Sequence, residues 1–168
     1  MNAHALHRRA AFGGALAATA AAAVVATHTW DVHASGRPPT VSRVMLGAKA
    51  NPVGVRGRTL GLYRVVIPPR AQLALHRHPG AQIAYVQQGV LTYTVRNGFV
   101  DVMRGAADAA PRRVRRIAAG QTGEIGAGEW IVEVPSDVHR AANRADGRVV
   151  VLLATLFKTG SPPAIPVG

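Results

Sequence analysis

The sequence predicts an all-β domain, and three observations support this. From Val41 onward, apolar residues recur with period two or in short solid runs, and β-branched residues are frequent. Gly, Pro, Asn or Asp interrupts the chain after each run. No part of this region carries an apolar stripe at helical spacing over ten or more residues. Several short strands at regular spacing are typical of a sandwich or a barrel.

The expected strands follow one another with short turns between them. They cover residues 59–68, 72–76, 81–89, 90–98, 98–105, 112–120, 128–135 and 147–157. Asn97-Gly98 predicts a tight hairpin, because these residues readily adopt the positive φ angles of a primed turn. The proline-rich tail from Thr159 is expected to lie extended along the surface.

The composition limits the possible functions. The chain has 168 residues, the length of one domain, and it has no cysteine. Disulfides, thiolate metal sites and cysteine nucleophiles are therefore excluded. The net charge is +12, but most arginines are scattered singly. The arginine-rich segment 112–116 is expected to be a solvated strand, with anionic lipid or polymer binding as the alternative; without stacked aromatics, nucleic-acid binding is not expected.

Residues 1–34 have the layout of a secretory signal. Arg8 and Arg9 precede an uncharged run of small and apolar residues, 10–26. Val32-His33-Ala34 would serve as a cleavage site, and Val24-Val25-Ala26 is a second candidate. The paired arginines resemble a twin-arginine signal. The alternatives are an alanine-rich helix that stays on the domain and a retained membrane anchor. We expect export to the periplasm or the extracellular space.

Residues 35–168 are then the mature domain, with a core at about 58–157. Within it, His76 and His78 stand two apart, so they share one face of a strand. His139 lies far away in the sequence, just after the expected strand 128–135. Three imidazoles that meet inside a small barrel would hold a divalent ion. An amide oxygen from Gln82 could complete a fourth position.

These residues resemble the two sequence motifs of the cupin superfamily. His76-Arg77-His78 fits the HxH of the first motif, and Gln82 stands where the family has glutamate. The second motif is matched by Gly128, Pro135, His139 and Asn143. The resemblance implies a small jelly-roll β-barrel with one metal site for Mn, Fe, Ni, Cu or Zn, and a homodimer formed through outer strands.

The chain departs from the motifs at several positions. Arg70 occupies the first glycine position, and Ser136-Asp137 replaces the usual glycine turn. Gln82 has the largest chemical consequence, because a neutral amide leaves the ion with its full double charge. Metal affinity should then be lower, while the pull of the ion on a bound oxygen should be stronger. Alternatively, Gln82 bonds a substrate or a ligand water, or the barrel has lost its metal site. The three retained histidines favour metal binding.

Two functions agree with these residues. The first is a metal-dependent enzyme acting on a small organic molecule, since the resemblance extends to dioxygenases of the quercetinase type and related isomerases. The second is a non-catalytic module of the cell envelope that binds a small ligand or a metal, which the absence of an evident general base favours. Glu133 could bond a histidine N–H. We expect instead that Glu133, on the strand that also carries Glu129 and Trp130, lies at a solvated strand edge.

Overall fold

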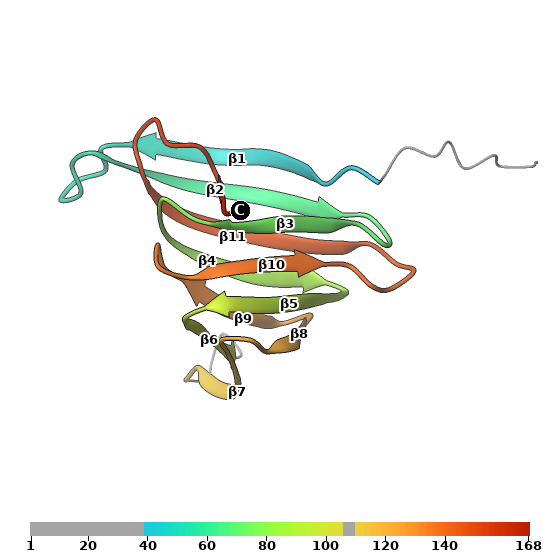
Figure 1. Ribbon diagram of the computed structural model, residues 1–168. Coiled ribbons are helices and arrows are strands. Elements are labelled where there is room, and N and C mark those ends of the chain that lie inside the picture. The colour runs from blue at the N-terminus through green and yellow to red at the C-terminus, as the bar shows by residue number, and fades with distance from the viewer. Residues whose placement is uncertain (1–38, 106–109) are drawn as a thin grey trace, which may run out of the picture. The chain divides into compact units, whose positions relative to one another are not determined.

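Twelve β-strands make up the regular structure of the described residues, 39–105 and 110–168, in the computed structural model (Figure 1). The strands are β1 (Ser42–Ala50), β2 (Arg58–Ile67), β3 (Gln72–Arg77), β4 (Gly80–Gln88), β5 (Val90–Asn97), β6 (Phe99–Arg104), β7 (Arg112–Ala118), β8 (Thr122–Gly126), β9 (Glu129–Glu133), β10 (Val138–Ala142), β11 (Val149–Lys158) and β12 (Ile165–Pro166). None of these residues forms a helix long and apolar enough to cross a membrane. The predicted secretory segment, residues 1–34, lies outside the described residues.

The strands form two antiparallel sheets, as expected for an all-β jelly roll. The larger sheet has the order β1-β2-β11-β4-β9-β6-β7, and the smaller has the order β12-β3-β10-β5-β8. The chain passes repeatedly from one sheet to the other, so β11 lies between β2 and β4, far from both in sequence. The expected closure into a barrel is wrong for the described residues, because no ladder joins the edge strands of one sheet to those of the other.

Four of these strands, β1, β8, β10 and β12, were not predicted as separate elements. The most important is β10, which carries His139 and pairs with both β3 and β5. It has five residues, and only two of them, His139 and Ala141, are buried. So short a run, with a histidine and a small residue on its buried face, shows little of the apolar alternation by which strands are identified.

The core lies between the inner faces of the two sheets. Burial alternates along β4, where Gln82, Ala84 and Val86 point inward. Fully buried aliphatic residues come from both sheets, and each contributes about 1.5–3 kcal/mol to folding. The hydrophobic core therefore consists mainly of valine, isoleucine and leucine, and the predicted histidines are among the buried polar residues beside it.

Arg70, which stands at the first glycine position of the cupin motif, has a φ of 62°. This is the left-handed region that normally favours glycine. Its guanidinium donates to the carbonyl of Arg144 and, at 2.5 Å, to the carboxylate of Asp146. Arg70 thus adopts a backbone conformation that glycine takes readily, and its side chain makes contacts that a glycine could not.

Candidate metal centre

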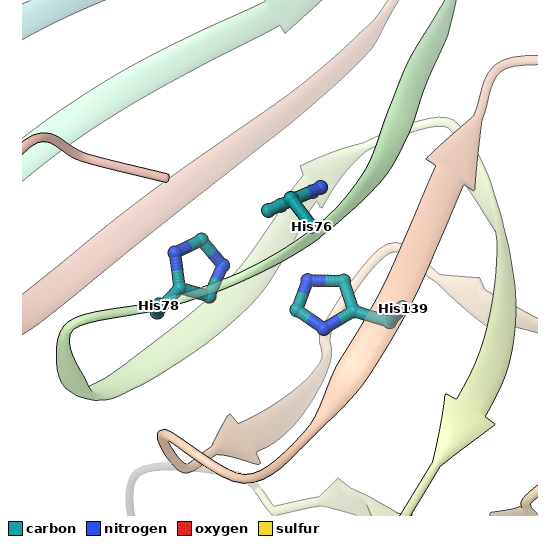
Figure 2. Close-up of side chains that lie close together, drawn as sticks. All are labelled: His76, His78 and His139. Atoms are coloured by element: carbon teal, nitrogen blue, oxygen red, sulfur yellow. The ribbon is translucent and has the colours of Figure 1, made fainter. Parts of the chain in front are cut away.

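The structure brings the three predicted histidines together between the sheets (Figure 2). His76 on β3 lies directly opposite His139 on β10 in the strand register, and His78 follows β3 at the turn into β4. The ring centroids are 4.5–5.1 Å apart. All three side chains are buried, and a ligand nitrogen of each lies within 4.8 Å of the others. This is the spacing of groups that can share one ion.

Backbone carbonyl groups fix the orientation of two of the rings. The Nδ1 of His76 donates to Ala74 O at 2.7 Å, and the Nδ1 of His78 donates to Pro163 O at 2.8 Å. Because a carbonyl oxygen can only accept, each ring carries its proton on Nδ1 and keeps the lone pair of Nε2 for another partner. Metal-ligating histidines are typically held in this way. Pro163 lies in the C-terminal tail, which reaches this site instead of lying only along the surface.

His139 is the most buried of the three histidines. Burial lowers its pKa to about 4, with a further contribution from His76 and His78, although Glu133 acts in the opposite direction. Burial likewise lowers the pKa of His78. Both rings are therefore neutral at pH 7, the form that coordinates metals. The Nδ1 of His139 is buried and has no hydrogen-bond partner in the described part of the chain.

Glu133, at the end of β9, also belongs to this site. The expectation that it lies at a solvated edge is wrong, since its exposed fraction is only 3%. Its Oε1 lies 3.0 Å from His139 Nε2, and its Oε2 lies 3.6 Å from His78 Nε2. It accepts hydrogen bonds from Tyr93 Oη, at 2.6 Å, and from the amide of Gln82. The reason is strand order: β9 lies between β4 and β6, and its first, third and fifth residues face the interior.

The carboxylate of Glu133 is held in its ionised form. Burial alone would raise its pKa, but His139 and His78, with the hydrogen bonds from Tyr93 and Gln82, together lower it below the usual range. Burial and the neighbouring Glu133 raise the pKa of Tyr93 well above its usual value. Tyr93 therefore keeps its proton and acts as a hydrogen-bond donor to the carboxylate.

Gln82 contacts both Glu133 and His78 through its amide nitrogen. This nitrogen donates to Glu133 and lies 2.9 Å from His78 Nε2, while Oε1 is buried without a partner among the described residues. An ionised carboxylate only accepts hydrogen bonds, so Glu133 selects the nitrogen side of the amide. The sequence predicted a contact between the amide oxygen and the ion, and that contact stays a prediction.

The residues present fit a divalent metal ion. Two donors bound to one ion at about 2.1 Å lie about 3.0–3.4 Å apart in octahedral or tetrahedral geometry. The distance of 3.0 Å between His139 Nε2 and Glu133 Oε1 falls in this range. Imidazoles with a carboxylate suit Zn, Cu, Fe, Ni or Mn. The buried unpartnered Nδ1 of His139 shows that the hydrogen bonds of the described chain do not satisfy the site completely.

A cavity of about 130 Å³ adjoins the histidines. Its polar wall contains the three histidines with Gln82, Tyr93 and Glu133. Arg43 also lines the cavity, and the remainder is aliphatic, including Val65, Ile67, Leu73, Leu91, Val151 and Leu153. The cavity thus combines an apolar surface with one cluster of convergent polar groups, the usual composition of a small-molecule site.

No protein-family model and no curated protein matches this chain. Solved structures do match. The polyketide cyclase RemF from Streptomyces resistomycificus is 17% identical, with a TM-score of 0.50 over 79% of this chain and 76% of that chain. A cupin 2 domain-containing protein from Halorhodospira halophila is 12% identical, with a TM-score of 0.48 over 76% of this chain and 71% of that one. A cupin superfamily protein from Desulfitobacterium hafniense is 13% identical, with a TM-score of 0.47 over 72% and 81%.

The predicted all-β fold is confirmed: the described residues form two antiparallel sheets, and the fold is similar to that of RemF. Glu133 is the site residue that sequence reasoning considered as a partner of a histidine but expected at a solvated edge. The available signal was the spacing of Glu129, Ile131 and Glu133, which share one face of the strand.

Proposed function

We propose that the domain binds one divalent metal ion through His76, His78 and His139 and acts on a small organic molecule in the adjoining cavity. The observation that carries this proposal is the cluster of three buried imidazoles, with an ionised carboxylate beside them, at the wall of a largely aliphatic cavity. Buried polar groups of this kind are retained where they bind a ligand or support chemistry.

The ion would supply a Lewis acid that polarises an oxygen atom of the substrate. The chain itself would bind and orient the molecule. Aliphatic side chains of β2 and β11, such as Val65 and Leu153, would pack against its carbon skeleton and exclude water. Tyr93 would keep its proton and donate a hydrogen bond to the carboxylate of Glu133, which holds that carboxylate in place.

The size of the cavity limits the substrate. At about 130 Å³ it is slightly smaller than an engineered cavity of about 150 Å³ that accommodates benzene. A substrate with an oxygen-bearing group at the histidines and a short apolar body would match it. Phenols and enols have this form, which supports a dioxygenase or an isomerase. RemF, a polyketide cyclase with the same fold, supports a reaction on a small organic molecule.

The second candidate is a non-catalytic cupin that binds a small ligand or a metal in the cell envelope. One observation favours it: Glu133, a carboxylate at the cavity, already accepts hydrogen bonds from Tyr93 and Gln82. A carboxylate that is held in this way is poorly placed to take a proton from a substrate. In this case the metal would be structural or would itself be the cargo.

We also propose that the domain is exported, on the evidence of Arg8-Arg9 and the apolar run that follows. Mass spectrometry of the periplasmic or extracellular fraction should find a chain that begins near Ser35. An intact chain beginning at Met1 and confined to the cytosol would contradict export.

Elemental analysis of protein folded in its native host tests the metal site, and His139→Ala provides the matched control. Stoichiometric metal in the wild type, and none in the variant, is the expected result. Oxygen uptake and product analysis with phenols and enols then test the reaction. A metal-loaded protein whose melting temperature rises with such compounds, but which consumes none of them, would indicate the binding module.

A further inference from the structure

Gln82 and Glu133 occupy facing positions on neighbouring strands. They are direct partners in the register of β4 and β9, both side chains point inward, and they are hydrogen-bonded. Directly opposite residues of an antiparallel pair have Cβ atoms about 4.5–5.5 Å apart. A carboxylate placed on either strand can therefore reach the same point between the sheets.

We propose that Glu133 is the carboxylate ligand of the metal ion and that Gln82 positions it. The glutamate that the cupin motif has on β4 would thus be replaced by one on β9. This inference rests on the metal site proposed above, and it assigns a ligand position that lies outside both sequence motifs.

The distances within the site support Glu133 as a ligand. One carboxylate oxygen lies 3.0 Å from His139 Nε2, and the other lies 3.6 Å from His78 Nε2. These are close to the donor separations of about 3.0–3.4 Å expected around one ion. The carboxylate therefore lies beside the two imidazoles at the spacing of a fellow ligand.

The charge of the site gives an independent argument. Within the described chain, the ion-pair contacts of Glu133 are with His78 and His139, and none is with arginine or lysine. Glu129, which is equally buried on the same strand, contacts both Arg104 and Arg115. Buried charges in proteins are paired or coordinate metals. The contacts of Glu133 are thus groups that can share a metal ion with it, whereas those of Glu129 are cations of the chain itself.

The identity of Gln82 follows from the same contact. Its amide donates to Glu133 and holds the carboxylate toward the histidines. A glutamate at position 82 would place two carboxylates in direct contact, which costs stability unless a cation separates them. Glutamine on β4 and glutamate on β9 therefore form a complementary pair. We expect that the two residues can be exchanged, so that the carboxylate comes from β4 and the amide from β9.

The test is a chelator competition with Zn²⁺ on metal-free protein at one pH. Five chains are compared: the wild type, Glu133→Gln, Glu129→Gln, His139→Ala and the exchange variant Gln82→Glu/Glu133→Gln. Glu133→Gln should weaken zinc binding by about 100-fold, because loss of a ligand should match or exceed the 10–100-fold effect of losing a group behind one. Glu129→Gln should stay within about twofold of the wild type, because its partners lie outside the histidine cluster. The exchange variant should recover to within about tenfold of the wild type, because it restores a charged ligand.

A second readout separates a ligand from a supporting residue. The visible spectrum of Co²⁺ reports the donors around the ion, and it should change in Glu133→Gln and return in the exchange variant. Wild-type affinity in Glu133→Gln would overturn the proposal. So would weak binding in both Glu133→Gln and the exchange variant, since the carboxylate would then act only by hydrogen bonding.

Circular dichroism checks that each variant is folded, and the exchange variant decides the question if Glu133→Gln alone does not fold. A wild type that takes up no Zn²⁺ and no Co²⁺ would overturn the metal site itself. By contrast, equal zinc affinities of the wild type and Glu133→Gln would refute only the role of Glu133 as a ligand.

Discussion

Glu129 and Glu133 lie four residues apart on the same inward face of β9, yet their side chains contact different kinds of groups. Glu129 accepts hydrogen bonds from the backbone of Gly126, at 2.8 Å, from Arg104, at 3.0 Å, and from Arg115. Glu133 contacts two histidines, Gln82 and Tyr93. Both side chains are 3% exposed. Equal burial therefore does not imply an equal role.

The difference lies in where the compensating charge comes from. Arginines on β6 and β7 reach Glu129 from the edge of the larger sheet, so its charge is balanced within the chain. Burial would raise the pKa of Glu129, but Gly126 and Arg115 together lower it. The contacts of Glu133 within the described residues include no arginine or lysine, and the proposed metal ion would balance its charge. One carboxylate fits a structural role and the other a functional one.

Of the changes considered, removal of a histidine should have the largest effect on metal binding. His139→Ala or His76→Ala is expected to weaken zinc binding by more than about 100-fold while the β-sheets remain folded, because each removes a direct ligand. Elemental analysis gives the metal content and circular dichroism gives the fold. If both variants keep the metal content of the wild type, the histidines do not form the site.

A second carboxylate beside Glu133 should have the next largest effect. Gln82→Glu places like charges opposite each other, so the free energy of unfolding of the metal-free protein should fall by about 2 kcal/mol. Zinc should restore it, because both carboxylates can then contact a cation. Urea denaturation with and without a chelator measures both quantities. Equal stability of the two metal-free proteins would mean that the two side chains are not in contact.

Neutralising Glu129 should affect stability alone. Glu129→Gln is expected to lower the free energy of unfolding by about 1–2 kcal/mol at pH 7, because two arginines lose their acceptor. The folded-state pKa of Glu129 lies below that of the unfolded chain, which is about 4.3. The contribution is therefore complete above the unfolded pKa and is lost as the pH falls through the folded pKa.

Urea denaturation of the wild type and Glu129→Gln at a series of pH values checks this sign. The gap in stability between the two proteins should be constant from pH 7 to about pH 5 and should narrow below that. A gap that widens on acidification would refute the assignment of Glu129 as a stabilising ionised group.

An exposed ion pair should have the smallest effect on stability. It provides a reference for the two buried glutamates. Arg70 pairs with Asp146, whose side chain is 92% exposed, so the pair contributes at most about 1 kcal/mol. Arg70→Gly loses the pair but relieves the positive φ, and we expect a net change within about 0.5 kcal/mol. Arg70→Ala loses the pair and keeps the strained backbone, so it should melt at a lower temperature than Arg70→Gly. Equal melting temperatures would show that the backbone is not strained here.

The sequence was sufficient to predict the all-β fold and the proximity of the three histidines. Alternation along β4 places Gln82, Ala84 and Val86 on one face, and the HxH spacing places His76 and His78 close together. It was not sufficient for β10, because the buried positions of that strand carry a histidine and a small residue instead of large apolar side chains.

Glu133 was expected at a solvated edge because alternation does not say which face of a strand is the inner one. In the segment Glu129–Glu133, the glutamates alternate with Trp130 and Val132, so the pattern fits a strand whose apolar residues point inward. The structure has the opposite arrangement. Val132 and Val134 are exposed on the outer face, while Ile131 and both glutamates point inward. Only the pairing with β4 and the arginines of β6 and β7 makes this orientation favourable.

The hydrogen bond from His78 to Pro163 has a consequence for the timing of assembly during synthesis. The two residues are 85 positions apart, and Pro163 is translated after every proposed ligand. The segment is anchored when β12 pairs with β3 and Val167 donates to Leu75 O. Until then, His78 lacks the acceptor that fixes its proton on Nδ1. A nascent chain that stops before Pro163 would contain every ligand and still present one imidazole in no fixed tautomer, so the complete site forms only after this late segment has docked.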